Sequence, residues 1–158
     1  MNQHHALAPT LQPQAPPDLW DPAEIAHLDQ AVDYAARVCK GAVSEFFAAP
    51  AAATGTTTPG IEIAVEFFVP PASVEAFRGE LDRAMIRRNL AYSAARRAAR
   101  AGPVTVTVLP PCTFGQWRST WKLDARSTRA RRWSNDRQLL DGVVRHAASG
   151  WREIFGTA

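Results

Sequence analysis

Arginines dominate the segment of this sequence best suited to binding an anion. Residues 126–133 read Arg-Ser-Thr-Arg-Ala-Arg-Arg-Trp, so that Arg129, Arg131 and Arg132 lie close together beside Trp133. Guanidinium groups bind phosphates through paired hydrogen bonds, and an indole ring can stack on a base. A solvated loop with a partly buried tryptophan is the alternative, because most charge runs on protein surfaces are simply hydrated.

Three further residues have side chains that could take part in chemistry. Cys112 follows Pro110 and Pro111 at the expected start of a helix, where backbone dipoles lower the pKa of a thiol. The alternative role for Cys112 is that of a small buried apolar side chain. Thr113 is expected to cap the same helix. Glu66 lies on a predicted strand, where it is either a general base or the partner of an arginine across the sheet.

Motifs of self-sufficient enzymes are missing from the sequence. Its glycines at 41, 55, 60 and 79 stand alone, which excludes a glycine-rich phosphate loop of the dinucleotide or P-loop type. His27 and His146 belong to separate predicted helices, and no cluster has metal-ligand spacing. No Gly-x-Ser-x-Gly nucleophile elbow occurs. The remaining candidates are therefore arginines that act on a bound anion rather than a complete active site.

Composition limits the classes of function further. The chain has 158 residues, enough for one domain, with 46% hydrophobic and 21% charged residues. Its 18 basic and 15 acidic residues give a net charge of +3, too small to require a nucleic-acid or membrane partner. The sequence shows no apolar run of membrane-spanning length and no secretory signal, so a cytoplasmic location with reduced Cys39 and Cys112 is expected.

The elements that position these residues follow from periodicity. Residues 1–19 are proline-rich and are expected to form a disordered tail. Helical spacing, β-branched alternation and capping residues predict the following elements: a helix from Asp21 to about Gly41, strands over 42–47 and 61–69, a helical stretch from Ser73 to Gly102, a strand over 104–109, a helix from Thr113, and a last helix from Ser134 or Asn135 to about Ala148.

Residue patterns within these elements predict the fold class. The two strands flanking residues 50–60 are expected to pair antiparallel, and the stripe Val74, Phe77, Leu81, Met85 and Leu90 is expected to be buried. The prediction is an α+β domain over residues 20–150, in the order α-β-β-α-β-α-α, with a small, mainly antiparallel sheet covered by helices. Residues 151–158 are expected to form a tail.

Five short motifs, in order, carry a resemblance to a known family. They are Glu45-Phe46, Val65-Glu66-Phe67-Phe68 with Pro70-Pro71, Leu81-Asp82 with Asn89, Tyr92 and Arg96, Val106 to Pro111 with Thr113-Phe114 and Trp117, and Arg132-Trp133-Ser134-Asn135-Asp136. From Pro22 to about Ala147 the chain resembles the small C-terminal domain of the Gretchen Hagen family of acyl-acid amido synthetases. These enzymes belong to the acyl-adenylate-forming superfamily.

The resemblance implies a fold and a function. It implies the lid domain of an enzyme that uses ATP and magnesium to make an acyl-adenylate and then transfers the acyl group to an amine. Because the ATP-binding domain has no counterpart here, this chain is expected to act as a separate lid subunit that docks on an ATP- and acyl-binding partner. It is expected to bind no cofactor alone and to be inactive alone. Arg129, Arg131 and Arg132 are the implied phosphate contacts, and Cys112, Thr113 and Glu66 shape the site.

Two departures from the family pattern affect these roles. The family stretch Gln-x-Lys-x-Pro-Arg aligns with Ser127, Arg129, Arg131 and Arg132, so only its final arginine is retained. The family glycine before Thr-Phe is Cys112, which predicts a turn whose backbone angles tolerate a side chain. A catalytically degenerate interaction or regulatory module is therefore an alternative function. An arginine-rich nucleic-acid-binding domain is another.

Overall fold

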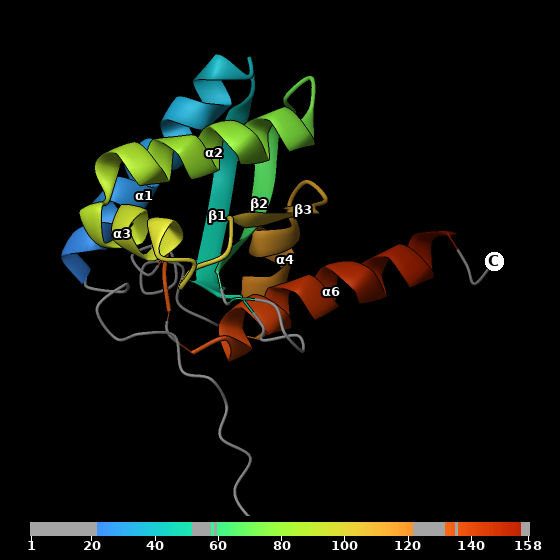
Figure 1. Ribbon diagram of the computed structural model, residues 1–158. Helices are drawn as coiled ribbons and strands as arrows, with labels where there is room; N and C mark the ends of the chain where they lie inside the picture. Colours follow the sequence, from blue (N-terminus) through green and yellow to red (C-terminus); the bar gives the residue numbers. More distant parts are fainter. Residues whose placement is uncertain (1–21, 52–57, 59, 122–131, 135, 156–158) are drawn as a thin grey trace, which may run out of the picture.

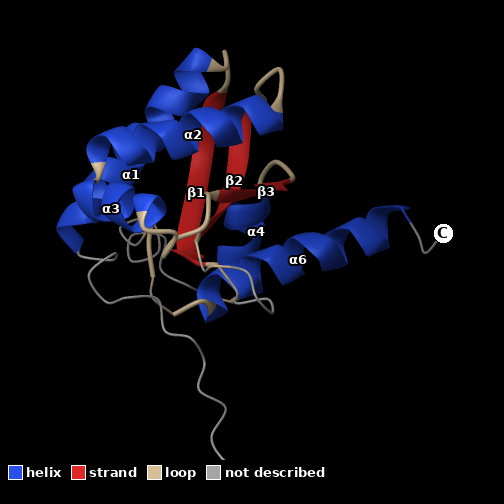
Figure 2. Ribbon diagram, viewed as in Figure 1, coloured by secondary structure: helices blue, strands red, loops and turns tan. Residues whose placement is uncertain are grey.

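The computed structural model describes residues 22–51, 58, 60–121, 132–134 and 136–155, with side chains described from residue 27 to residue 150 of these ranges. The elements are α1 (Pro22–Val38), β1 (Ala42–Pro50), β2 (Ile61–Val69), α2 (Val74–Arg88), α3 (Leu90–Arg97), β3 (Thr105–Leu109), α4 (Thr113–Thr120) and α6 (Gln138–Phe155). Figure 1 shows helices on both sides of a small sheet, and Figure 2 separates the two kinds of element by colour. The predicted α+β class is confirmed.

Two apolar cores lie on opposite faces of the sheet. Successive strand residues point to opposite faces, so Phe46 enters one core and Phe47 the other. The first core is shared with α1, α2 and α3 and includes Val32, Ile63, Val65, Phe77, Leu81 and Tyr92. The second is shared with α4 and α6 and includes Ala64, Leu109, Phe114, Trp117, Leu140 and Val143. The sheet is thus the middle layer of three.

The sheet is mixed, in the order β1-β2-β3. The predicted antiparallel pairing of β1 with β2 is confirmed and includes Glu45 opposite Glu66. β3 pairs parallel to β2, with Glu66 opposite Leu109. Two parallel neighbours need a long crossover connection, and α2 with α3 provides it. This crossover brings the end of β3 to the same edge of the sheet as Glu66.

The helical stretch predicted from Ser73 to Gly102 is two helices separated at Asn89. The backbone of Asn89 is extended, with φ −119° and ψ 106°, and its N–H donates to the Met85 carbonyl at 2.9 Å to close α2. Its side-chain oxygen accepts a hydrogen bond from the Tyr92 N–H at 2.7 Å and so caps α3. Asparagine competes for backbone hydrogen bonds in this way because its short side chain reaches them.

The predicted buried stripe was wrong at its two ends, and the break at Asn89 explains the second of them. Phe77, Leu81 and Met85 are buried, but Leu90 is 83% exposed and Val74 is 40% exposed. Leu90 begins a new helix, so the helical period of α2 does not extend to it. Ser73 caps α2 as predicted, accepting a hydrogen bond from Ala76 N–H at 3.1 Å.

The last helix also differs from its prediction. It begins at Gln138 and continues to Phe155, beyond the expected end near Ala148. The Asp136 carboxylate accepts from the Gln138 N–H at 2.9 Å, while Ser134 accepts from the Asp136 N–H at 3.0 Å. Asp136 therefore takes the capping role assigned to Ser134 or Asn135, and Asn135 itself lies outside the described residues, as does the proposed cap Asp21.

Candidate functional site

The turn between β3 and α4 gathers three of the predicted site residues. The carboxylate of Glu66 accepts hydrogen bonds from the N–H of Cys112 at 2.8 Å and of Phe114 at 3.2 Å. Glu66 is buried, with 7% of its surface exposed. The N–H groups at a helix start have no partner within the helix and attract negative charge. Glu66 thus caps the N-terminus of α4 from β2, the strand that pairs with β3.

The turn differs from four of the expectations raised by the sequence. Thr113 does not cap the helix, since its hydroxyl donates to the Pro110 carbonyl at 2.7 Å. Cys112 is the N-cap residue, has φ 67°, and is exposed rather than buried. It therefore adopts the left-handed conformation that favours glycine, contrary to the side-chain-tolerant angles expected. Among the described residues, Glu66 forms no ion pair with an arginine across the sheet.

A second carboxylate ties α4 to the sheet. Arg118 forms a bidentate ion pair with Glu45, with the Nη2 to Oε2 distance 3.0 Å. The Arg118 side chain is only 9% exposed. Glu45 lies directly opposite Glu66 in the β1–β2 pairing, so neighbouring carboxylates hold the two ends of one short helix. Each negative charge has its own compensating partner, which makes their proximity tolerable.

Arg132 lies at the other edge of the sheet. Its carbonyl accepts a hydrogen bond from the Ala48 N–H at 2.9 Å. Two residues later, the N–H of Ser134 donates to the Ala48 carbonyl at 3.1 Å. The guanidinium of Arg132 bonds Asp29 at 3.0 Å and lies 5.2 Å from the ring centroid of Phe46, which faces the α1–α3 core. Arg132 is therefore separated from Glu66 by β1 and directed to the opposite face.

The structure thus groups Glu66, Cys112 and Thr113 and keeps Arg132 apart from them. Arg129 and Arg131 lie outside the described residues. The described residues stop at Trp121 and resume at Arg132.

Arg137 is an organising residue that sequence reasoning missed. Its guanidinium contacts the Glu62 carboxylate at 2.6 Å, the Pro50 carbonyl at 2.9 Å and the Asp141 carboxylate at 3.0 Å. These contacts fix the start of α6 to the ends of β1 and β2. Only the i,i+4 spacing of Arg137 and Asp141 is visible in the sequence, because Glu62 and Pro50 reach Arg137 through the tertiary fold.

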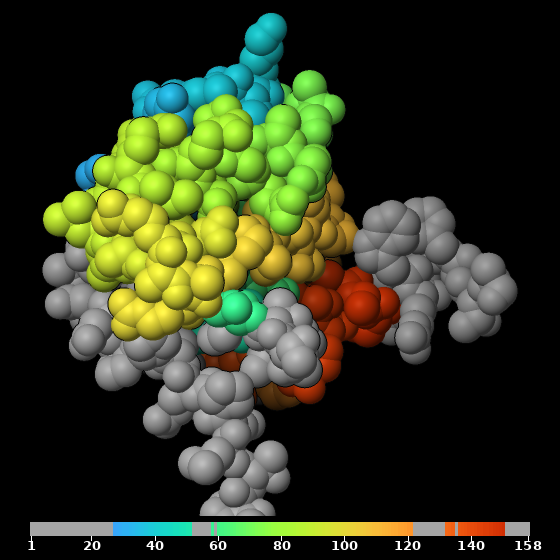
Figure 3. All heavy atoms as spheres, viewed as in Figure 1, coloured from blue at the N-terminus to red at the C-terminus, as the bar shows by residue number. Residues whose placement is uncertain are grey.

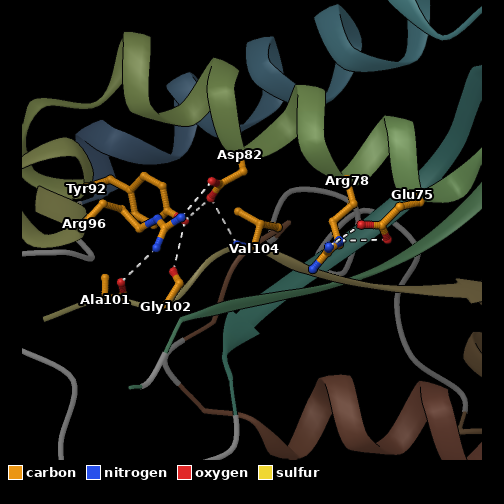
Figure 4. Close-up of polar contacts among 8 residues, drawn as sticks. All are labelled: Glu75, Arg78, Asp82, Tyr92, Arg96, Ala101, Gly102 and Val104. Atoms are coloured by element: carbon orange, nitrogen blue, oxygen red, sulfur yellow. Dashed lines mark hydrogen bonds and ion pairs between the residues drawn. The ribbon is translucent and has the colours of Figure 1, made fainter. Parts of the chain in front are cut away.

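The motif residues Asp82, Tyr92 and Arg96 form one polar network between α2 and α3, as Figure 4 shows. The Tyr92 hydroxyl donates to Asp82 at 2.6 Å, and Arg96 contacts the other Asp82 oxygen at 3.0 Å. Burial, and then the hydrogen bond to Asp82, raise the pKa of Tyr92 above its ordinary value. Asp82 also accepts from the Val104 N–H at 3.2 Å, so the network fixes the entry to β3.

The described residues limit the kind of site present. Within this part of the chain, no group of three or more His, Cys, Asp and Glu residues is arranged to hold a metal ion. None of its helices combines the length and apolar character needed to cross a membrane.

Comparison with known proteins places this architecture in a family. The GH3 family C-terminal domain matches residues 26–129. The fold resembles a structure described as GH3.15 acyl acid amido synthetase, with TM-score 0.54, 13% identity and 78% of this chain covered. It also resembles AtGH3.15 acyl acid amido synthetase in complex with 2,4-DB, with TM-score 0.62, 12% identity and 76% of this chain covered.

These likenesses differ in what they establish. At such identities the two structures show the fold, and the chain spans 23% of the length of each. No curated protein matches the chain by sequence. The family match, however, extends over more than half of the chain and includes the predicted motifs from Glu45 to Trp117. The chain therefore belongs to the GH3 family, in which it corresponds to the C-terminal domain.

Proposed function

We propose that this domain is the lid of an adenylate-forming amide synthetase and that it docks on a separate subunit that binds ATP and the acyl acid. The observation that carries the proposal is the match of residues 26–129 to the GH3 family C-terminal domain. Structural neighbours described as acyl acid amido synthetases support it, and this chain covers 23% of each. ATP and acyl binding then fall to the remaining part of such an enzyme.

The proposed reaction has two steps. A carboxylate oxygen of the acyl acid attacks the α-phosphorus of ATP, which forms the acyl-adenylate and releases pyrophosphate. An amine nitrogen then attacks the acyl carbon, the bond to the phosphate breaks, AMP leaves, and the nitrogen loses a proton. Negative charge on the phosphate changes in both steps, so positive groups placed beside it stabilise the transition states. Closure of a lid also excludes water that would hydrolyse the adenylate.

In this proposal Arg129 and Arg131 contact the phosphate and Arg132 supports them. Arg132, which directly follows Arg131 in the sequence, is fixed by its contacts with Ala48, Asp29 and Phe46. Its side chain remains 46% exposed, so part of the guanidinium is accessible to an anion. Arginines at these positions act as planar forks for phosphate oxygens rather than as point charges.

Glu66, Cys112 and Thr113 have a supporting role in the same proposal. The Glu66 carboxylate is engaged by two backbone N–H groups, so it shapes the β3–α4 turn rather than accepting a proton from a substrate. The same contact occupies N–H groups of α4 that would otherwise be available to a phosphate. The phosphate contact is therefore assigned to the arginine segment.

ATP and magnesium are assigned to the partner. The described residues hold no cluster of metal-ligating side chains, and the sequence has no glycine-rich phosphate loop. Magnesium prefers carboxylate and phosphate oxygens, which the proposed complex obtains from the partner and from ATP. We therefore assign no step of the proposed reaction to a metal held by this chain.

A reconstitution experiment tests the proposal. The tagged full chain is purified from its native cells with nuclease present, and co-purifying proteins are identified by mass spectrometry. The recovered partner is then expressed and assayed for amide formation and AMP release, with and without added chain. We expect saturable stimulation by the chain and its loss in the Arg129→Ala/Arg131→Ala variant. Arg145→Ala, on α6, is the matched control.

Two outcomes contradict the proposal. Stimulation that survives the loss of Arg129 and Arg131 removes their assigned role. A partner that binds the chain without any change in ATP turnover indicates an interaction or regulatory module instead.

A further inference from the structure

The helical layer α1–α3 carries a surplus of positive charge on the outside of the domain. Among described side chains of residues 27–40 and 73–100, four carboxylates are paired with arginines: Asp29 with Arg132, Glu75 with Arg78, Glu80 with Arg83, and Asp82 with Arg96. The same residues include one carboxylate, Asp33, and six cations without an ion pair to another described residue: Arg37, Lys40, Arg87, Arg88, Arg97 and Arg100. These residues together hold nine basic and five acidic side chains, a net charge of +4, so they alone account for the net charge of +3 of the whole chain.

Two of these arginines are held together on one tyrosine. The guanidinium carbon of Arg88 lies 4.9 Å from the ring centroid of Tyr34, and that of Arg87 lies 5.3 Å from it. Cation–π contact orders the flat face of a guanidinium and leaves its N–H donors at the edge for another group. Tyr34 belongs to α1 and the arginines to the last turn of α2, so the cluster spans two packed helices.

Exposed aliphatic side chains adjoin this charge. Leu90, two residues after Arg88, is 83% exposed, and Val38, next to Arg37, is 48% exposed. Figure 3 shows that α2 and α3 form one continuous face of the molecule. We call this outer surface of α1, α2 and α3 the basic face. It combines arginine, a residue type that is enriched in protein interfaces, with exposed aliphatic contact area.

The composition favours a protein partner over a nucleic acid. Single-stranded nucleic acids are bound by arginines together with aromatic rings on which bases stack. Among the described side chains of this layer, no large aromatic residue is exposed, and the Tyr34 ring is covered by guanidinium groups. A protein partner can place an apolar side chain against Leu90 and can pair its carboxylates with the arginines.

We propose that the basic face, centred on Arg87, Arg88 and Leu90, binds an acidic protein segment that carries an exposed aliphatic side chain. Charge complementarity selects the partner, and the two guanidiniums ordered by Tyr34 supply paired hydrogen bonds to its carboxylates. This surface is distinct from the β3–α4 turn, which lies on the other side of the sheet. The inference does not depend on the proposed amide chemistry.

A peptide-binding experiment on the full chain tests this inference. The probe is a labelled peptide of glutamate with leucine at every fourth position, compared with a version in which glutamine replaces glutamate and with a single-stranded oligonucleotide of similar length. Binding is measured by fluorescence anisotropy, and NMR shifts of backbone amides locate the contact. We expect the acidic peptide to bind most tightly, to shift amides around Tyr34 and residues 87–97, and to weaken as salt is added.

Matched variants separate the basic face from general charge effects. Reversal of two charges in R87E/R88E should weaken binding about tenfold or more, and L90S should weaken it by a smaller factor. Arg145→Glu reverses one charge on α6 and should change affinity little. If R87E/R88E loses its fold by circular dichroism, R87Q/R88Q provides the same comparison without added negative charge. Tighter binding of the oligonucleotide, equal binding of the glutamine peptide, or unchanged affinity in both double variants would overturn the inference.

Discussion

The carboxylate of Glu66 accepts a hydrogen bond from the backbone N–H of Cys112 at 2.8 Å, across 46 residues of sequence. A side chain of β2 thereby caps the N-terminus of α4, a helix whose own N-cap residue makes no side-chain hydrogen bond to it. The contact depends on the parallel pairing that sets Leu109, the last residue of β3, opposite Glu66. Strand order and helix capping are thus linked through one side chain.

Removal of the Glu66 carboxylate should destabilise the domain. In Glu66→Ala the N–H groups of Cys112 and Phe114 lose a charged acceptor, which we expect to lower the free energy of unfolding by about 2–4 kcal/mol. Glu66→Gln keeps one acceptor oxygen and should lose less. Urea unfolding monitored by circular dichroism measures both, with Glu75→Ala on the exposed start of α2 as the control. Equal losses at positions 66 and 75 would show that the cap contributes nothing particular.

Glycine at position 112 should stabilise the protein. Cys112 has φ 67°, a region that costs an L-residue roughly 1–2 kcal/mol, whereas glycine enters it freely. Part of the gain is offset because glycine also loosens the unfolded chain, which leaves an expected net gain of about 1 kcal/mol for Cys112→Gly. Cys112→Ala controls for loss of the thiol, and Cys112→Val should be less stable than either. A thermal melt that ranks glycine below alanine would contradict this account of the turn.

The ion pair between Glu45 and Arg118 should behave as one unit. Because both side chains are largely buried, removal of either partner leaves a desolvated charge, and Arg118→Ala or Glu45→Ala should cost about 3–5 kcal/mol. The double variant removes both charges and should cost less than the two single losses added together. A double-mutant cycle measures this coupling, for which we expect at least about 1 kcal/mol. Additive losses would mean that each residue acts through packing alone.

Stability should fall at high pH through Tyr92. Its raised pKa keeps the folded phenol neutral, while the phenol of the unfolded chain ionises near pH 10 as usual. Unfolding then releases a proton above that pH, so this contribution to stability is constant below about pH 10 and is lost at about 1.4 kcal/mol per pH unit above it. Tyr92→Phe removes this dependence, although it also removes the bond to Asp82.

Urea unfolding at pH 8 and pH 11 measures the effect as a difference between the two proteins. Other groups that titrate in this range contribute equally to wild type and Tyr92→Phe. The stability advantage of the wild type should therefore shrink or reverse at pH 11. An advantage that is the same at both pH values would contradict the raised pKa.

Two glycines should respond oppositely to alanine. A Cβ on Gly102 would meet the Thr58 carbonyl oxygen at 2.6 Å, so Gly102→Ala forces the backbone apart and should cost about 1–3 kcal/mol. A Cβ on Gly115 in α4 would meet nothing within 4 Å, so Gly115→Ala should stabilise the helix by about 0.5–1 kcal/mol. Thermal melts of the two variants check both signs. Shifts in the same direction would contradict the close approach of the chain segments at Thr58 and Gly102.

Much of the fold follows from local patterns in the sequence. The alternation from Ile61 to Phe67 predicts a strand with one apolar face, and those residues do enter the α1–α3 core. Ser73 signals the start of α2 because a hydroxyl can reach an N–H three residues later. Periodicity did not predict the break at Asn89, because the apolar spacing continues through it while the backbone becomes extended. The motif of Asn89 and Tyr92 did mark the position, without revealing that it is a helix cap.

The candidate site could be predicted only in part from such local patterns. Glu66, Cys112 and Thr113 were singled out from residue type, and the structure brings all three to one turn. The cap expected of Thr113 was wrong, and the cross-sheet arginine considered for Glu66 is not found among the described residues, although an acidic strand residue often pairs across the sheet and a threonine often caps a helix. Here the Glu66 carboxylate accepts a hydrogen bond from a backbone N–H of α4, and the Thr113 hydroxyl donates to the Pro110 carbonyl.

The sequence by itself determined most of the elements, their order and most of the apolar faces they bury, because these depend on residues within one or two helical turns or on strand alternation. The tertiary structure decided the partners of the charged residues: Glu66 with the start of α4, Glu45 with Arg118, and Glu62 with Arg137. Each joins groups that lie 46 to 75 residues apart in the sequence, at positions set by the mixed strand order and the crossover. Local propensity carries no information over such separations, whereas a buried charge is stable only beside the group that compensates it.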